Sequence, residues 1–165
     1  MAQSFADFIT EENKEENYKV VILTVEFGDK SITAKKFEKE AQKMGMKTFL
    51  ANFKEVSLHF SDGKHTLSDG KKEIEIDKSD TVVFVRGTPT RDSMLDLISE
   101  LERLGITCIN NRTTISICAD KYRSYVRLKD FRLNQPKTVL IPNEESVEQA
   151  LEELDTKFPI ILKTL

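Results

Sequence analysis

Residues 81–89 read Thr-Val-Val-Phe-Val-Arg-Gly-Thr-Pro, and this stretch decides the fold class. Thr81 to Val85 form a nearly continuous apolar run, which is typical of a strand covered on both faces, as in a parallel sheet with helices on each side. Arg86 follows the run, and Thr88 is expected to cap a helix that begins at Pro89, where the missing N–H of proline has no partner anyway. The stretch therefore predicts a strand that leads through a short turn into a helix.

The residues on both sides of this stretch repeat the pattern. A buried strand is expected at 19–25, and further strands are expected at 46–50 and 106–109. Helical spacing of apolar residues is found at 34–44 and 94–104. Between them, apolar residues alternate with polar ones at 56–60 and 74–76, and the turn pairs Asp62-Gly63 and Asp69-Gly70 predict an antiparallel ribbon. The order strand, helix, strand, ribbon, strand, helix, strand indicates an α/β sheet.

The chain changes character near Asn111. We expect a helix at 114–128, a strand at 138–141, an acidic helix around 147–154 and a last strand from Pro159. Three parts follow from this reading: an acidic, flexible arm at 1–17, an α/β domain at 18–110, and the beginning of a second, α+β unit at 111–165.

Composition excludes several classes of protein. The 165 residues carry 25 basic and 28 acidic side chains, a net charge of -3, and 39% are hydrophobic, which describes a soluble globular protein. No run is long enough to span a membrane, and the acidic N-terminus does not resemble a leader, so we expect a cytoplasmic protein. Cys108 and Cys118 are expected to be reduced, buried thiols, and His59 and His65 belong to no ligand cluster, so no metal site is predicted.

Two stretches carry candidate binding residues. Arg86 ends a buried strand at the carboxyl edge of the sheet, where open α/β sheets bind ligands, so it is a candidate for binding an anionic substrate. The alternative is that Arg86 pairs with a surface carboxylate. Residues 112–137 hold seven basic side chains against two acidic ones, with Tyr122, Tyr125 and Phe131 among them. This pattern fits binding of phosphates or bases, and it fits a solvated helix face equally well.

The order of the motifs resembles the ATP-grasp superfamily, in particular the RimK-type carboxylate–amine ligases related to glutathione synthetase. The resemblance covers 82–165. It rests on the strand that ends in Arg86, the helix and turn that lead to Asn110, the pair Asp120-Lys121, and two further motifs. These two are Pro136-Lys137-Thr138 and the apolar run that ends in Lys163.

The resemblance implies a Rossmann-like pre-ATP-grasp domain with an antiparallel ribbon, followed by an incomplete α+β ATP-grasp subdomain. It also implies that Lys121 and Lys163 contact the phosphates of ATP, that Mg²⁺ takes part, and that an amine attacks an acyl-phosphate made from a carboxylate substrate, to which Arg86 binds. The sequence ends two residues after Lys163, before the family's glycine-rich loop and magnesium ligands. The chain as given is therefore expected to be an inactive N-terminal portion, with no catalytic residue of its own and no tightly bound cofactor.

Two other readings remain open. The basic 112–137 segment is a candidate for binding nucleic acid or another polyanion, although the negative total charge argues against it. The ribbon at 56–76 is a candidate for a contact between copies of the chain, because exposed edge strands pair readily and the family's ligases are commonly oligomers.

Overall fold

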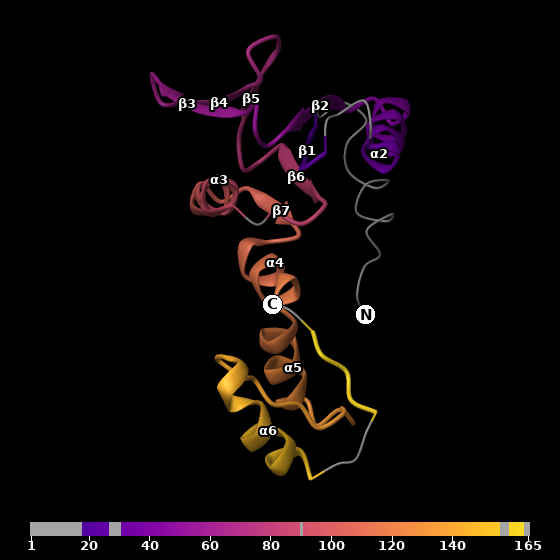
Figure 1. Cartoon of the computed structure of the whole chain (residues 1–165). Coiled ribbons are helices and arrows are strands. Elements are labelled where there is room, and N and C mark those ends of the chain that lie inside the picture. Colours follow the sequence, from indigo (N-terminus) through magenta and orange to yellow (C-terminus); the bar gives the residue numbers. More distant parts are fainter. Residues whose placement is uncertain (1–17, 27–30, 90, 156–158, 164–165) are drawn as a thin grey trace. The chain divides into compact units, whose positions relative to one another are not determined.

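The computed structural model of the chain describes residues 18–26, 31–89, 91–155 and 159–163 (Figure 1). It is a mixed α/β structure with one parallel and one antiparallel sheet, as the sequence predicts in general terms. The chain divides into two compact units, residues 1–112 and 113–165. The expected acidic arm at 1–17 lies outside the described residues.

A four-stranded parallel sheet forms the centre of the first unit. It contains β1 (Lys19–Thr24), β2 (Lys47–Asn52), β6 (Thr81–Arg86) and β7 (Thr107–Ile109), in the order β2-β1-β6-β7. The register places Val21 between Phe49 and Val83, and all three side chains are buried. The four strands predicted for this sheet are thus confirmed. The continuous apolar run of β1 reflects its burial on both faces, whereas the edge strand β7 is largely exposed.

Helices α2 (Ile32–Lys43) and α3 (Asp92–Arg103) cover the two faces of this sheet. The connection β1–α2–β2 moves one way along the sheet and β6–α3–β7 moves the other way, so two right-handed crossovers put the helices on opposite faces. Figure 1 shows α2 and α3 on either side of the strands. On the α2 face, Val20 and Ile22 pack with Ala34 and Ala41.

The start of α3 differs from the sequence prediction. The helix begins at Asp92 with Arg91 as its N-cap residue, so Thr88 is not the cap and Pro89 is not the first helical residue. Pro89 is buried instead. Burial of the Pro89 ring outweighs the preference of proline for the first position of a helix.

The predicted ribbon is confirmed as a three-stranded antiparallel sheet. It consists of β3 (Ser57–Ser61), β4 (Lys64–Ser68) and β5 (Glu73–Ile76) in that order. Asp62 and Gly63 form the two-residue turn between β3 and β4 with positive φ angles of 49° and 75°, as the sequence pair suggests. Leu67, Ile74 and Ile76 are buried on one face.

The regular secondary structure in the described residues of the second unit is entirely helical. The predicted helix at 114–128 is two helices, α4 (Arg112–Ala119) and α5 (Lys121–Lys129), because Asp120 interrupts the first and caps the second. A 3₁₀ turn, η1 (Glu144–Ser146), precedes α6 (Val147–Leu154), which matches the predicted acidic helix.

The two strands expected in this unit are absent from its described residues. Residues 138–141 and 159–163 have no regular secondary structure, and Ile161 and Leu162 are 83% and 77% exposed. An apolar run becomes a strand only when a neighbouring strand accepts its hydrogen bonds, and none does so here.

None of the helices in the described ranges combines the length and the apolar character that a membrane-spanning helix requires.

Candidate functional site

The two central strands of the parallel sheet end side by side. In the order β2-β1-β6-β7, the chain leaves β1 toward one edge and β6 toward the other, so the crevice beyond their carboxyl ends is the topological switch point of the sheet. Open α/β sheets bind ligands at such points. Thr24 ends β1 and Arg86, its partner in the register, ends β6.

Buried polar side chains hold the chain in position beyond these strand ends. The Thr24 hydroxyl accepts a hydrogen bond from the Glu26 N–H at 3.1 Å. Asn52, 1% exposed at the end of β2, accepts from the Lys54 N–H at 2.8 Å and donates to the Val25 carbonyl at 3.4 Å. The edge is therefore a rigid scaffold, because its buried amide and hydroxyl groups have partners.

Gly87 brings the two central loops together. It has a φ of 83°, and a Cβ atom at this position would lie 2.3 Å from Cγ2 of Val25. The Val25 N–H also donates to the Arg86 carbonyl at 3.3 Å. Glycine is thus required here for two reasons, the positive φ and the close approach.

The Arg86 side chain lies on the α2 face of this edge. Its guanidinium carbon is 5.5 Å from the centre of the Phe37 ring, and that ring lies 5.3 Å from the Phe84 ring. The Nε atom of Arg86 is buried and has no hydrogen-bond partner. A buried N–H without an acceptor costs about 1–3 kcal/mol.

The alternative explanation of Arg86 is not supported by the contacts of the described residues. That explanation requires an ion pair between Arg86 and a carboxylate, and none of the ion pairs among the described residues involves Arg86. Among the described residues, the Nε atom of Arg86 thus has no acceptor.

Lys121 and Lys163 occupy different surroundings. Lys121 is the first residue of α5 and is exposed, directly after Asp120, whose carboxylate accepts from the Arg123 N–H at 2.8 Å. The acidic residue of the Asp-Lys pair thus has a structural function as a helix cap. Lys163 is also exposed, and it lies outside any strand.

The basic segment has partial charge compensation within α5 and its ends. Arg123 pairs with Asp120 at 3.4 Å, and Arg127 pairs with Asp130 at 3.7 Å. The rings of Tyr122 and Tyr125 stack with their centres 6.1 Å apart. The ion pairs are typical of a solvated helix face, whereas the stacked rings offer a flat aromatic surface.

The thiols and imidazoles form no reactive or metal-binding group among the residues described. Both cysteines are free, as expected, but Cys118 is exposed, so the predicted burial is wrong for it. Burial, and to a lesser degree the nearby Glu102 carboxylate, raises the pKa of the Cys108 thiol to about 12. The His59 ring shares a hydrogen bond with the Ser57 hydroxyl, and the His65 ring packs edge-on against Phe60. In the described part of the chain, no three His, Cys, Asp or Glu side chains gather to hold a metal ion.

Comparison with protein-family models gives no match, and comparison with curated proteins gives no similar sequence.

Sequence reasoning singled out Arg86 as a candidate, but it pointed neither to Phe37, whose ring lies against Arg86, nor to Asn52 at the end of β2. Asn52 could have been found, because a polar residue at the end of a buried strand is unusual. Phe37 carries no such signal, since nothing in the spacing of α2 indicates that its ring meets a side chain some fifty positions later.

Proposed function

We propose that the chain is the N-terminal portion of an ATP-dependent carboxylate–amine ligase that works through an acyl-phosphate. In this proposal, residues 18–110 are a Rossmann-like pre-ATP-grasp domain, and Arg86 binds the carboxylate substrate. The observation that carries the proposal is the buried, unpartnered Nε of Arg86 at the switch point of a parallel sheet. A ligase that consumes ATP would work in the cytoplasm.

Arginine suits this role because its guanidinium is planar and permanently charged and can donate two parallel hydrogen bonds to a carboxylate. The Phe37 ring supports the guanidinium from one side, which limits its orientations. A substrate carboxylate that accepts from Nε would remove the cost of the unsatisfied donor. Binding energy would thus be concentrated on the group that reacts.

The resemblance assigns Lys121 and Lys163 to the phosphates of ATP, and an ammonium group suits phosphate oxygens as a point charge. ATP supplies the phosphoryl group that makes the carboxylate reactive toward an amine. The described residues do not fit Mg²⁺, because no cluster of carboxylates is present among them. The part of the reaction that this chain would perform is therefore binding and orienting the carboxylate.

Nuclear magnetic resonance of the arginine Nε–H groups tests the role of Arg86. Titration with glutamate or succinate is expected to shift the Arg86 Nε–H resonance in a saturable way, and glycerol is expected to leave it unchanged. Arg103, which pairs with Glu100 on the surface of α3, is the matched control. A resonance of Arg86 that stays constant while that of Arg103 shifts would refute carboxylate binding at this site.

The same residue allows a stability test. The Arg86→Met variant loses a cation–π contact worth about 0.5–1 kcal/mol, yet it removes an unsatisfied donor that costs about 1–3 kcal/mol. We expect an unchanged or higher free energy of unfolding for residues 18–112. A clear loss of stability would mean that Arg86 serves the fold rather than a ligand.

The family assignment is tested separately. The coding sequence downstream of Leu165 should encode a glycine-rich loop followed by Glu and Asn metal ligands. In that longer protein, isothermal titration with ATP should show a much larger loss of affinity for Lys163→Met than for Lys129→Met, the control for a general basic surface. Equal losses would remove the residue-level support for the nucleotide site.

A second candidate function is binding of a nucleic acid or another polyanion by the basic 112–137 segment. The stacked Tyr122 and Tyr125 rings favour it, because such a surface accepts bases irrespective of sequence. Binding dominated by phosphate contacts must weaken steeply as salt rises. Failure to retain single-stranded RNA or DNA on a filter at low salt would eliminate this candidate.

The antiparallel sheet supports the proposal that the protein forms homo-oligomers. Among the described strands, β3 pairs only with β4, and it contains no charged residue, whereas the other edge strand, β5, carries Glu73 and Glu75. Antiparallel pairing of two β3 strands about His59 would place Leu58 opposite Phe60, which is 55% exposed. Light scattering that reports a monomer at high concentration would contradict this contact, and Phe60→Lys should weaken it.

A further inference from the structure

The face of β6 and β7 that carries the Arg86 side chain is apolar and only partly covered. Side chains alternate along a strand, so Phe84 and Arg86 lie on the same face of β6, and the register places Ile109 of β7 beside Phe84. Helix α2 packs on β1 and β2, the other half of this face. Phe84 is half-buried and Ile109 is 41% exposed. Apolar side chains of β6 and β7 therefore reach solvent close to the Arg86 guanidinium.

The side of α2 next to these strands is apolar as well. The Phe37 ring, which is 39% exposed, has its centre 5.3 Å from that of Phe84 and 5.5 Å from the guanidinium carbon of Arg86. Met44, the C-cap residue, follows about two helical turns later on the same side of the helix and is 58% exposed. Two apolar surfaces thus meet at Arg86, one on the helix and one on the strands.

Arg86 supplies the charge at this junction. Its Nε atom is buried and has no hydrogen-bond partner, and none of the ion pairs among the described residues includes its guanidinium. Glu40, three positions after Phe37 on α2, pairs with Lys43 at 2.7 Å instead. The surroundings therefore favour a ligand with one anionic group. A second charged group would lose its hydration against the apolar surfaces without gaining a partner there.

We propose that the carboxylate substrate of the Arg86 site carries an apolar body, which packs on Phe37, Phe84 and Ile109. This inference rests on the proposed function, because Arg86 binds the carboxylate in both. It narrows the substrate class to monocarboxylates with an aliphatic chain or a ring. With a rise of about 1.5 Å per residue, Met44 lies about 10 Å beyond Phe37 along α2, so an extended aliphatic chain can follow this side of the helix.

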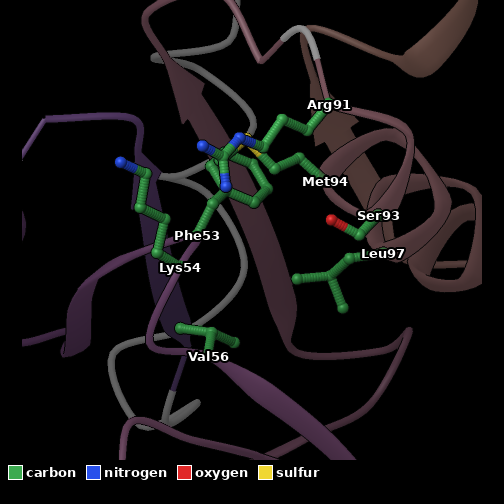
Figure 2. A pocket seen from close by; sticks show the side chains of 7 residues that line it. All are labelled: Phe53, Lys54, Val56, Arg91, Ser93, Met94 and Leu97. Carbon is green, nitrogen blue, oxygen red and sulfur yellow. The ribbon is translucent and has the colours of Figure 1, made fainter.

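This surface is distinct from the cleft of about 390 Å³ that Figure 2 shows. The cleft lies between the segment that follows β2 and the beginning of α3, and its lining includes Met94 and Leu97. None of its lining residues belongs to the Arg86 surface. Resonances of the cleft residues therefore serve as an internal control for binding elsewhere on the first unit.

The test is a titration of the whole chain, followed by nuclear magnetic resonance of the Arg86 Nε–H and the Ile109 methyl groups. The probes are hexanoate, acetate and hexan-1-ol. We expect saturable shifts of both signals with hexanoate and an affinity about tenfold lower for acetate, because covering about 50–60 Å² of apolar surface accounts for that ratio. Hexan-1-ol, which has the chain without the charge, should bind at least about tenfold more weakly than hexanoate.

A matched pair of variants assigns the apolar contact. Ile109→Ser should weaken hexanoate about three- to fivefold and leave acetate unchanged, because only the apolar body loses a contact. Ile32→Ser is the control. Ile32 is 71% exposed at the start of α2, and its position five residues before Phe37 puts it on a different side of the helix, so this variant should bind hexanoate as the parent chain does.

The outcomes separate this inference from the proposed function. Equal affinities for hexanoate and acetate, or equal losses in Ile109→Ser and Ile32→Ser, would overturn the apolar body while carboxylate binding at Arg86 stands. Hexan-1-ol binding as tightly as hexanoate, or shifts centred on Met94 and Leu97, would overturn it as well. An Arg86 Nε–H resonance that neither carboxylate shifts would refute the proposed function, and this inference with it.

Discussion

Replacing Gly87 with alanine is expected to destabilise the first unit far more than the same replacement at Gly70. The two glycines have nearly equal φ angles, 83° and 80°, so the backbone cost of an alanine, about 1–2 kcal/mol, is the same at both positions. Only the surroundings of the added methyl group differ.

Those surroundings give the size of the difference. At Gly70 no atom lies within 4 Å of the new Cβ, whereas at Gly87 the Cγ2 atom of Val25 lies at 2.3 Å. Overpacking of this kind costs about 1–3 kcal/mol, so Gly87→Ala should lose about 2–5 kcal/mol in total. Val25→Ala removes the clashing atom and leaves the Val25 Cβ at 3.5 Å, an ordinary contact, so the double variant should regain the steric part.

Native-state hydrogen exchange of the β1 and β6 amides measures the effect, because it reports the free energy of opening for this sheet separately from the second unit. The expected result is a non-additive pair, in which Val25→Ala lessens the cost of Gly87→Ala by about 1–3 kcal/mol. Equal losses for Gly87→Ala and Gly70→Ala, or a strictly additive double variant, would refute the argument that close approach at the switch point requires glycine.

Three further outcomes are expected. Asp120→Ala should destabilise α5 by about 1 kcal/mol, and Asp120→Asn by much less, because asparagine can still cap the helix. Amide exchange in α5 measures both losses, and equal losses would contradict the capping role of Asp120. A thiol reagent at pH 8 should label Cys118 quickly and Cys108 at least about a hundredfold more slowly, because a pKa near 12 leaves Cys108 almost no thiolate. Mass spectrometry of the labelled peptides measures both rates, and faster labelling of Cys108 would contradict this prediction. Amides of 138–141 should exchange faster than those of 82–85, and equal protection would mean that the second unit holds a sheet after all.

The strands of the first unit follow from local sequence, because a run such as Thr81 to Val85 has no other way to bury every side chain than between two covering layers. The turn of Asp62 and Gly63 is equally local, since few residue pairs accept two positive φ angles. The position of Arg86 at the end of β6 followed from the same reasoning.

Tertiary structure decided the rest. Helix α3 begins at Asp92 where Pro89 is buried, and this burial depends on the tertiary fold. The Arg86 Nε has no partner because of the groups that other elements bring near it, and the spacing of residues in the sequence does not show which groups these are. In the second unit, the apolar runs at 138–141 and 159–163 carry a strand pattern without forming strands. A strand takes its hydrogen bonds from residues distant in the chain, whereas a helix takes them from its own neighbours, so α5 and α6 could be predicted and those strands could not.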